Sequence, residues 1–176
     1  MKNKKKRLLI RTLILVLLFG MVGYTLYQNL TKDNKGKVTV GKTAPNFELE
    51  TLKGESFQLS DFKGKAVLIN FWGTWCEPCK REMPNIQAAF EKYHKQGFEV
   101  ISIDDGVESK FIVNKFIKQY GLTFPISQDK KSKVNNTYKV YNLPASFFIN
   151  RNGKVVRAFE GEMNKDQLEQ WIGEIL

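Results

Sequence analysis

The two cysteines of the chain, Cys76 and Cys79, are spaced so that they can form a disulfide with each other. They lie at the point where an apolar run ends and a helical pattern begins, in Trp72-Gly73-Thr74-Trp75-Cys76-Glu77-Pro78-Cys79. A helix N-terminus carries partial positive charge and free amide donors, which favour a thiolate on Cys76. Pro78 suits the first helical turn, where its missing N–H is not needed. The pattern therefore predicts a redox-active dithiol.

Four other chemistries are open for this pair. A structural disulfide closing so short a loop removes little chain entropy and stabilises a fold weakly. A zinc site needs about four ligands, and the chain adds only one histidine, His94, to the two cysteines. Two thiolates could carry Cu(I), but a third ligand is lacking. A peroxiredoxin site needs a threonine three residues before its attacking cysteine, where this chain has Gly73. We therefore favour thiol-disulfide exchange.

The elements that must position the cysteines follow an α/β pattern. Residues 66–71 form an almost unbroken apolar run, typical of a strand buried on both faces, and residues 78–96 show helical spacing. We also predict a hairpin over 47–59, strands at 98–103, 145–149 and 154–159, helices at 108–120 and 131–139, and a last helix capped by Asn164. The stretch between residues 121 and 131 is expected to be irregular. This order predicts a mixed central sheet with helices on both faces.

Most of the positive charge lies at the N-terminus. Residues 1–37 carry nine Lys or Arg and one acidic residue, whereas the remainder carries nineteen basic and seventeen acidic residues. Such a distribution indicates membrane topology and argues against nucleic-acid binding. The segment 8–30 would span about 34 Å as a helix, enough to cross a bilayer.

The charge asymmetry also predicts an orientation. Residues 1–7 are expected in the cytoplasm, 8–30 in the membrane, 31–42 as a polar tether and 43–176 as an extracytoplasmic domain. A cleaved secretory signal is the alternative, but no alanine precedes Ala44 to provide the usual cleavage site. Both interpretations place the domain outside the cytoplasm.

Three motifs resemble a known family. The run from Trp72 to Cys79, together with Leu143-Pro144-Ala145-Ser146-Phe147-Phe148-Ile149, resembles the thioredoxin superfamily. Ala44-Pro45-Asn46-Phe47-Glu48-Leu49 is similar to its membrane-anchored TlpA/ResA branch, and the segment 76–84 is most similar to the ResA family of cytochrome c maturation. The resemblance implies a thioredoxin-like fold with an N-terminal β-hairpin extension.

The resemblance also implies roles for individual residues. Cys76 corresponds to the exposed attacking cysteine and Cys79 to the buried resolving cysteine. Pro144 corresponds to a proline that is cis in this superfamily and lies beside the active site, where the backbone of Leu143 could pair with a bound peptide. From the residues alone, a trans proline at the start of a strand is equally compatible. Trp75, Glu77, Pro78, Leu143 and Pro144 are the predicted substrate-binding residues.

Glu82 is the third predicted catalytic residue. It follows Cys79 by three positions and therefore lies one helical turn further on, on the same side. A partly buried carboxylate has a raised pKa and can accept a proton from a buried thiol. The resembled family has an equivalent glutamate, which implies that Glu82 is the proton acceptor for Cys79. A surface glutamate paired with Lys or Arg is the alternative.

The direction of electron flow is predicted from Glu77, which lies between the cysteines and weakly disfavours a thiolate beside it. This favours a reductant over an oxidant. By resemblance, the substrate is the disulfide of apocytochrome c before haem attachment, and a membrane thiol donor similar to CcdA restores the dithiol. We expect no metal and no cofactor beyond the Cys76–Cys79 disulfide. Another cell-envelope or sporulation client, a disulfide oxidant and a copper chaperone are the alternatives.

Overall fold

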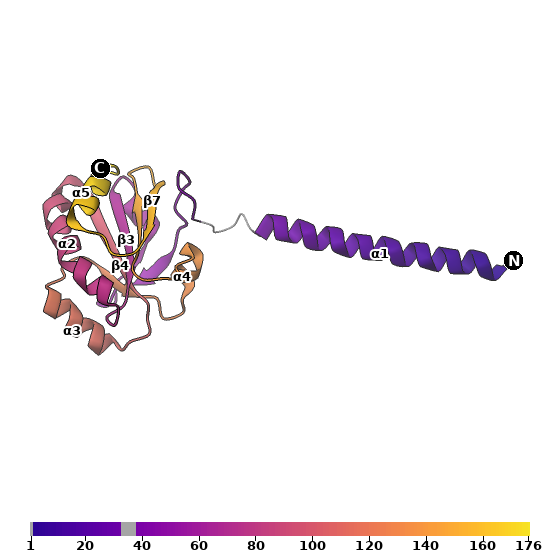
Figure 1. Cartoon of the computed structure of the whole chain (residues 1–176), viewed down its shortest axis with the longest axis horizontal. Coiled ribbons are helices and arrows are strands. Elements are labelled where there is room, and N and C mark those ends of the chain that lie inside the picture. Colours follow the sequence, from indigo (N-terminus) through magenta and orange to yellow (C-terminus); the bar gives the residue numbers. More distant parts are fainter. Residues whose placement is uncertain (1, 33–37) are drawn as a thin grey trace. The chain divides into compact units, whose positions relative to one another are not determined.

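The computed structural model describes residues 2–32 and 38–176, which fall into two separate units (Figure 1). The first contains helix α1, Lys2–Lys32, and the second is the compact unit Val38–Leu176. Residues 33–37 of the predicted tether lie outside the described residues, whereas residues 31 and 32, also assigned to the tether, belong to α1. Lysine is a good helix former, which explains why α1 extends beyond 8–30 at both ends.

Helix α1 contains an apolar segment long enough to cross a membrane. The segment Leu9–Tyr27 has 19 residues and a mean hydropathy of 2.0, and its side chains are exposed. A helix of this length covers about 28 Å at 1.5 Å per residue, close to the thickness of the hydrocarbon core. The prediction of one N-terminal apolar helix is thus confirmed.

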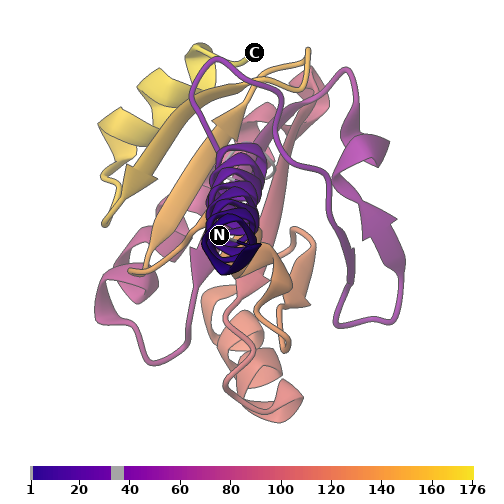
Figure 2. The ribbon, with the colours of Figure 1, turned by 90° about the vertical axis from the view of Figure 1, so that its right-hand side faces the viewer.

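The compact unit is built on a mixed five-stranded sheet in the order β5-β4-β3-β6-β7. Its strands are β3 (Ala66–Trp72), β4 (Phe98–Asp104), β5 (Ile126–Gln128), β6 (Ala145–Ile149) and β7 (Val155–Glu160). β3, β4 and β5 are parallel, whereas β6 and β7 pair antiparallel. A separate hairpin of β1 (Glu48–Glu50) and β2 (Ser56–Gln58) lies at the β5 edge (Figure 2). The predicted mixed sheet and N-terminal hairpin are confirmed.

Strand β5 corrects the expectation that the chain between 121 and 131 is irregular. It is only three residues long and pairs with β4, with Ser102 opposite Ile126. Because the strand is so short, it carries no recognisable alternation of polar and apolar residues. Its structure is imposed by the free edge of β4, which lies beside it.

The helices follow the predicted order with shifted ends. α2 covers Glu77–Tyr93, after which His94–Gln96 tighten into a 3-10 turn, so the predicted helix 78–96 ends early. α3 covers Lys110–Tyr120 and begins two residues later than predicted, because the Ser109 side chain caps it. α4 covers Lys133–Tyr138, and α5 covers Lys165–Gly173 with Asn164 as its cap, as predicted.

Helices cover both faces of the sheet, as predicted (Figure 1). α2, α3 and α5 pack on one face, in a core that includes Cys79, Phe116 and Trp171. α4 packs on the other face together with the first residues of the compact unit, in a core that includes Ala44, Phe47 and Tyr138. β3 is buried along its whole length, so the redox segment that follows it starts from a fixed position.

The compact unit begins before the predicted boundary at residue 43. Gly41 donates its N–H to the Val155 carbonyl at 2.7 Å, and the Val155 N–H donates to the Lys42 carbonyl at 2.9 Å. The last residues of the predicted tether are therefore fixed to β7.

Candidate active site

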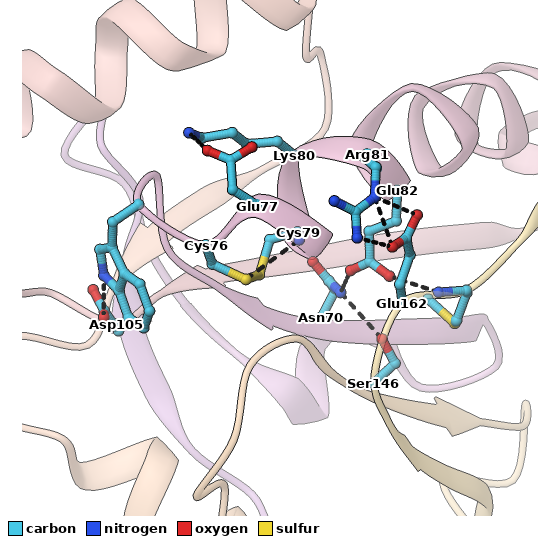
Figure 3. Close-up of a disulfide and its surroundings, with 12 residues drawn as sticks. Asn70, Cys76, Glu77, Cys79, Lys80, Arg81, Glu82, Asp105, Ser146 and Glu162 are labelled. Carbon is cyan, nitrogen blue, oxygen red and sulfur yellow. Dashed lines mark hydrogen bonds and ion pairs between the residues drawn. A yellow bond between two sulfur atoms is a disulfide. The ribbon is translucent and has the colours of Figure 1, made fainter.

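The disulfide between Cys76 and Cys79 lies at the N-terminus of α2, directly after the loop that follows β3 (Figure 3). Cys76 is the N-cap residue, and its sulfur accepts the N–H of Cys79 at 3.3 Å. The exposed fraction of Cys76 is 4%, whereas Cys79 is completely buried. Only Cys76 can therefore be reached from solvent, and the helix N-terminus stabilises a thiolate on it.

Glu82 lies one turn further along α2 and is completely buried. Its Oε1 accepts the side-chain amide of Asn70 at 2.8 Å, and its Oε2 accepts the N–H of Met163 at 3.1 Å (Figure 3). No surface ion pair involves this carboxylate in the described part of the chain. The alternative of a surface glutamate therefore does not fit the observed burial.

Burial raises the pKa of Glu82 from 4.5 to about 7. The N–H of Met163 and the amide of Asn70 oppose the shift, and the nearby charge of Glu162 adds to it. A carboxyl with a pKa near neutrality can both release and accept a proton at physiological pH. The local geometry can therefore serve proton transfer at the buried end of the cysteine pair.

Asn70 is a residue of the site that the sequence alone did not single out. It lies in β3, is completely buried, and also donates to the Ser146 hydroxyl at 3.1 Å. Through these two bonds it connects β6 to the Glu82 carboxylate. An asparagine inside an otherwise apolar strand was the available signal, because a buried amide needs polar partners.

The Glu82 carboxylate is also held from the side of β7 and α5. Arg81, its neighbour on α2, makes a double ion pair with Glu162, with Nε at 2.9 Å from Oε2. Glu162 precedes Met163, whose N–H binds Glu82. The ion pair thus fixes the segment that covers the buried carboxylate (Figure 3).

The loop after β4 holds the loop that carries the cysteines. The Trp75 indole donates to Asp105 at 3.0 Å, the Asp105 N–H donates to the Trp72 carbonyl at 3.0 Å, and the Thr74 hydroxyl donates to Glu108. Trp75 remains 57% exposed. It directly precedes Cys76 in the sequence, and its role in substrate binding stays a prediction, whereas its partners in the β4–α3 loop were not predicted.

The Trp75 indole lies close to Gly73. A Cβ atom on Gly73 would lie 2.7 Å from the Trp75 Nε1 atom, so the indole would have to shift to admit one. A threonine at this position, as a peroxidase site requires, would therefore displace the indole ring from its present place.

Another buried acid, Asp104, is the last residue of β4, directly before Asp105. Its Oδ1 accepts the Gly106 N–H at 3.1 Å and the Gln128 amide at 2.9 Å, whereas its Oδ2 is buried and has no hydrogen-bond partner among the described residues. Burial raises the pKa of Asp104 to about 6. This acid was not singled out from the sequence either.

Glu77 and Pro78 occupy the first turn of α2 between the cysteines. Glu77 is largely exposed and makes an ion pair with Lys80, whose hydrogen bond lowers the pKa of the Glu77 carboxyl. Lys80 therefore offsets part of the repulsion that Glu77 exerts on a Cys76 thiolate.

The Leu143–Pro144 peptide bond is cis, which confirms the expectation from the resemblance. In the sheet register Ala145 lies opposite Phe71, so Pro144 lies at the same end of the sheet as the redox loop. Pro144 is buried and Leu143 is half-buried. The structure thus brings both residues to the end of the sheet that carries Cys76.

This combination of a thioredoxin-like fold, a cysteine pair separated by two residues at a helix N-terminus and a cis proline at the same sheet end defines the thiol-disulfide oxidoreductases of the thioredoxin type. Residues 40–158 match the AhpC/TSA family. The chain belongs to this family and, within it, to the ResA group of thiol-disulfide oxidoreductases, as two relatives establish.

Thiol-disulfide oxidoreductase ResA of Bacillus anthracis is 48% identical over 98% of both chains. ResA of Bacillus subtilis (strain 168) is 43% identical over 97% of this chain and 94% of its own. These matches span nearly the full chain, and the chain is therefore a thiol-disulfide oxidoreductase.

Solved structures agree with this assignment. A putative thiol:disulfide interchange protein DsbE from Chlorobium tepidum has a TM-score of 0.72 and 33% identity, covering 78% of this chain and 98% of that chain. StoA from Bacillus subtilis has a TM-score of 0.64 and 29% identity, covering 72% of this chain and 96% of that chain. The predicted fold class is confirmed.

Proposed function

We propose that the chain reduces disulfides of polypeptides outside the cytoplasm, and that its client is apocytochrome c before covalent haem attachment. The main observation in favour of a reductant is the set of carboxylates near Cys76. Glu77 lies beside it, and Asp105 and Glu108 bind the preceding residues Trp75 and Thr74. Carboxylates near Cys76 disfavour its thiolate, and a dithiol whose reduced form is less stabilised is a stronger reductant.

The proposed reaction is a two-step thiol-disulfide exchange. The Cys76 thiolate attacks one sulfur of the client disulfide, the client S–S bond breaks, and the released client thiolate takes up a proton. Glu82 accepts the proton of the Cys79 thiol, and the Cys79 thiolate attacks the Cys76 sulfur in the mixed disulfide. The second client thiolate leaves, so the client gains two electrons and the Cys76–Cys79 disulfide forms.

One feature supports the location in this proposal. The apolar segment of α1 is suited to a single-pass anchor, with residues 1–7 in the cytoplasm by the positive-inside rule. Electrons are carried by the cysteine pair itself, without another cofactor. A membrane thiol donor similar to CcdA would reduce the pair again, because the extracytoplasmic side lacks the cytosolic reductants.

The client is tested by deleting the gene and measuring holocytochrome c. We expect holocytochrome c to fall, and to recover with the wild-type gene but not with Cys76→Ser. Unchanged holocytochrome c would contradict this client and favour another cell-envelope or sporulation protein, with the enzyme class intact.

The direction is tested by the reduction potential of the pair. We expect a value nearer to about −270 mV, typical of thioredoxin, than to about −120 mV, typical of strong oxidants. A value near that of the strong oxidants would contradict the proposed direction.

A further inference from the structure

Large apolar side chains are exposed at the start of α3. Val107 is 79% exposed, Phe111 78% and Ile112 43%. We call these three residues the α3 lip. Side chains of this kind on a surface are a feature of interaction sites when they gather in one place.

Hydrogen bonds fix the α3 lip next to the redox loop. Asp105 binds the Trp75 indole, and Glu108 binds the Thr74 hydroxyl. Val107 lies between these two contact residues in sequence, and Phe111 follows in the first turn of α3. The α3 lip and Trp75, itself 57% exposed, are therefore exposed apolar residues on two segments that hydrogen bonds join, and one of these segments leads into Cys76. We refer to them together as the apolar border.

Disulfide exchange requires a client to lie over this border. With only 4% of Cys76 exposed, a client sulfur can reach it only if the client chain passes across the residues around the entrance. An extended chain advances about 3.3 Å per residue, so the neighbours of the client cysteine must rest on the surrounding surface. An apolar side chain next to that cysteine would be removed from water by the α3 lip.

The reaction at Cys76 favours a polypeptide over a lipid surface. Glu77, Asp105 and Glu108 lie at or next to the redox loop, but Lys80 is paired to Glu77, Lys110 precedes Phe111 and the Lys130 backbone lies against Gly106. The charges near the α3 lip are therefore balanced and do not select the occupant. A client polypeptide must bring a disulfide sulfur to Cys76, whereas a lipid has none to bring.

Resting on the proposed function, we propose that the α3 lip is a client-binding surface that selects extended polypeptide segments with an apolar side chain within a few residues of the disulfide. The selectivity lies outside the cysteine pair, so it acts on polypeptide disulfides and not on small ones. The α3 lip contacts the residues that flank the client cysteine, and the reacting client sulfur contacts only Cys76.

In the test, the cysteine pair of the full chain is first reduced in detergent micelles. The rate of its reaction with three disulfide substrates is then compared. Two are cyclic disulfide peptides that differ only in a Phe or a Ser beside one cysteine, and the third is bis(2-hydroxyethyl) disulfide. The variant is Val107→Ser combined with Phe111→Ser. The control is Val40→Ser, an exposed apolar residue in the segment that pairs with the start of β7, at the other end of the sheet.

We expect the double variant to lower the second-order rate constant for the reaction of the reduced pair with the Phe peptide about fivefold to tenfold, which is the scale of one well-placed apolar contact. For the Ser peptide and the small disulfide, the double variant should differ from wild type by less than about twofold. The Val40→Ser control should differ from wild type by less than about twofold for all three substrates. An equal loss for all three substrates, or no loss for the Phe peptide, would overturn the proposal.

Two further outcomes distinguish failure of the proposed function from a contact with lipid. If the wild-type chain reduces none of the three substrates, the proposed function fails independently of the α3 lip. If the variant differs from wild type only when the chain is placed in vesicles containing phosphatidylglycerol, the α3 lip meets lipid and the client-binding proposal is wrong.

Discussion

The chemistry of the site depends on one buried carboxylate. Glu82 has no contact with solvent, and its two oxygens accept hydrogen bonds from Asn70 and Met163. These bonds favour the ionised form, but burial disfavours it more strongly, so the pKa rises to about 7. We therefore expect Glu82 both to take part in a proton-transfer step and to contribute to the pH dependence of folding.

The first prediction concerns the rate of resolution. In Glu82→Gln, release of a client from a preformed mixed disulfide on Cys76 should be about 100-fold slower at pH 8, the lower end of general-base effects. The difference should shrink below pH 6, where Glu82 is protonated in the wild type because its pKa is about 7.

This rate is measured by quenching samples over time and separating the free client. Glu91→Gln, an exposed substitution on the same helix, is the matched control and should behave like the wild type. Identical pH profiles for Glu82→Gln and the wild type would show that Glu82 is not the proton acceptor.

The second prediction concerns stability. Because folding raises the pKa of Glu82 from 4.5 to about 7, the folded state loses stability as the pH rises between these values, by about 3 kcal/mol at 1.36 kcal/mol per pKa unit. Glutamine cannot ionise, so the difference in unfolding free energy between Glu82→Gln and wild type should move by this amount in favour of the variant from pH 4.5 to 8. Urea unfolding at both pH values measures it. A constant difference would mean that the pKa of Glu82 is not shifted.

At the scale of elements, two neighbouring loops define the entrance to Cys76. The loop between β4 and α3 binds the redox loop through Asp105 and Glu108, and it is shaped by Gly106. Gly106 has φ of +78°, and a Cβ there would lie 2.6 Å from the Lys130 backbone. Only glycine fits a position that combines this backbone conformation with so close an approach.

The third prediction follows from this glycine. Gly106→Ala should destabilise the protein by about 2–4 kcal/mol, because it adds a backbone collision to the strain of a positive φ. Gly153→Ala is the control, since Gly153 has φ of +75° and open space around it. It should lose only about 1 kcal/mol.

Thermal unfolding of both variants measures the two losses, and tryptophan fluorescence, to which Trp75 contributes, reports on the redox loop. Equal destabilisation of the two variants would contradict the importance of the Lys130 contact.

Which elements could be predicted from the sequence depended on length and on local turn signals. β3, β4 and α2 were found because long apolar or helical patterns determine them. The equally short β1 and β2 were found because Lys53-Gly54 between them indicates a hairpin turn. β5 was missed because its three residues have no such turn beside them, and its conformation depends on pairing with β4.

The residues of the site also fall into those set by a local pattern and those set by tertiary contacts. Cys76, Cys79 and Glu82 could be found from spacing along one helix. Asn70, which binds Glu82 from β3, and Asp105, which binds Trp75 from another loop, are brought there by tertiary structure. Their contacts join residues far apart in the sequence, and no local pattern encodes them.

At the scale of the whole molecule, the compact unit contains all the described parts of the site. Both hydrophobic cores and every residue of the active site lie within Val38–Leu176, whereas the apolar segment of α1 lies in the other unit. The cysteine pair thus lies in one unit, and the helix that is long and apolar enough to cross a membrane lies in the other.

The fourth prediction tests this division. A chain starting at Val38 should fold, reduce bis(2-hydroxyethyl) disulfide at the rate of the full chain, and move from the membrane fraction to the soluble fraction. Fractionation and the reduction assay measure both properties. A fragment that stays with membranes, or that folds without activity, would contradict the division.

The central claim is that Cys76 forms a transient bond to a client sulfur that Cys79 then resolves. Intact-mass measurement of the reduced Cys79→Ala variant, after incubation with an oxidised disulfide peptide, tests it directly. We predict one covalently attached peptide per chain, removed by dithiothreitol, and none on Cys76→Ala. No adduct on Cys79→Ala, or equal adducts on both variants, would contradict the account.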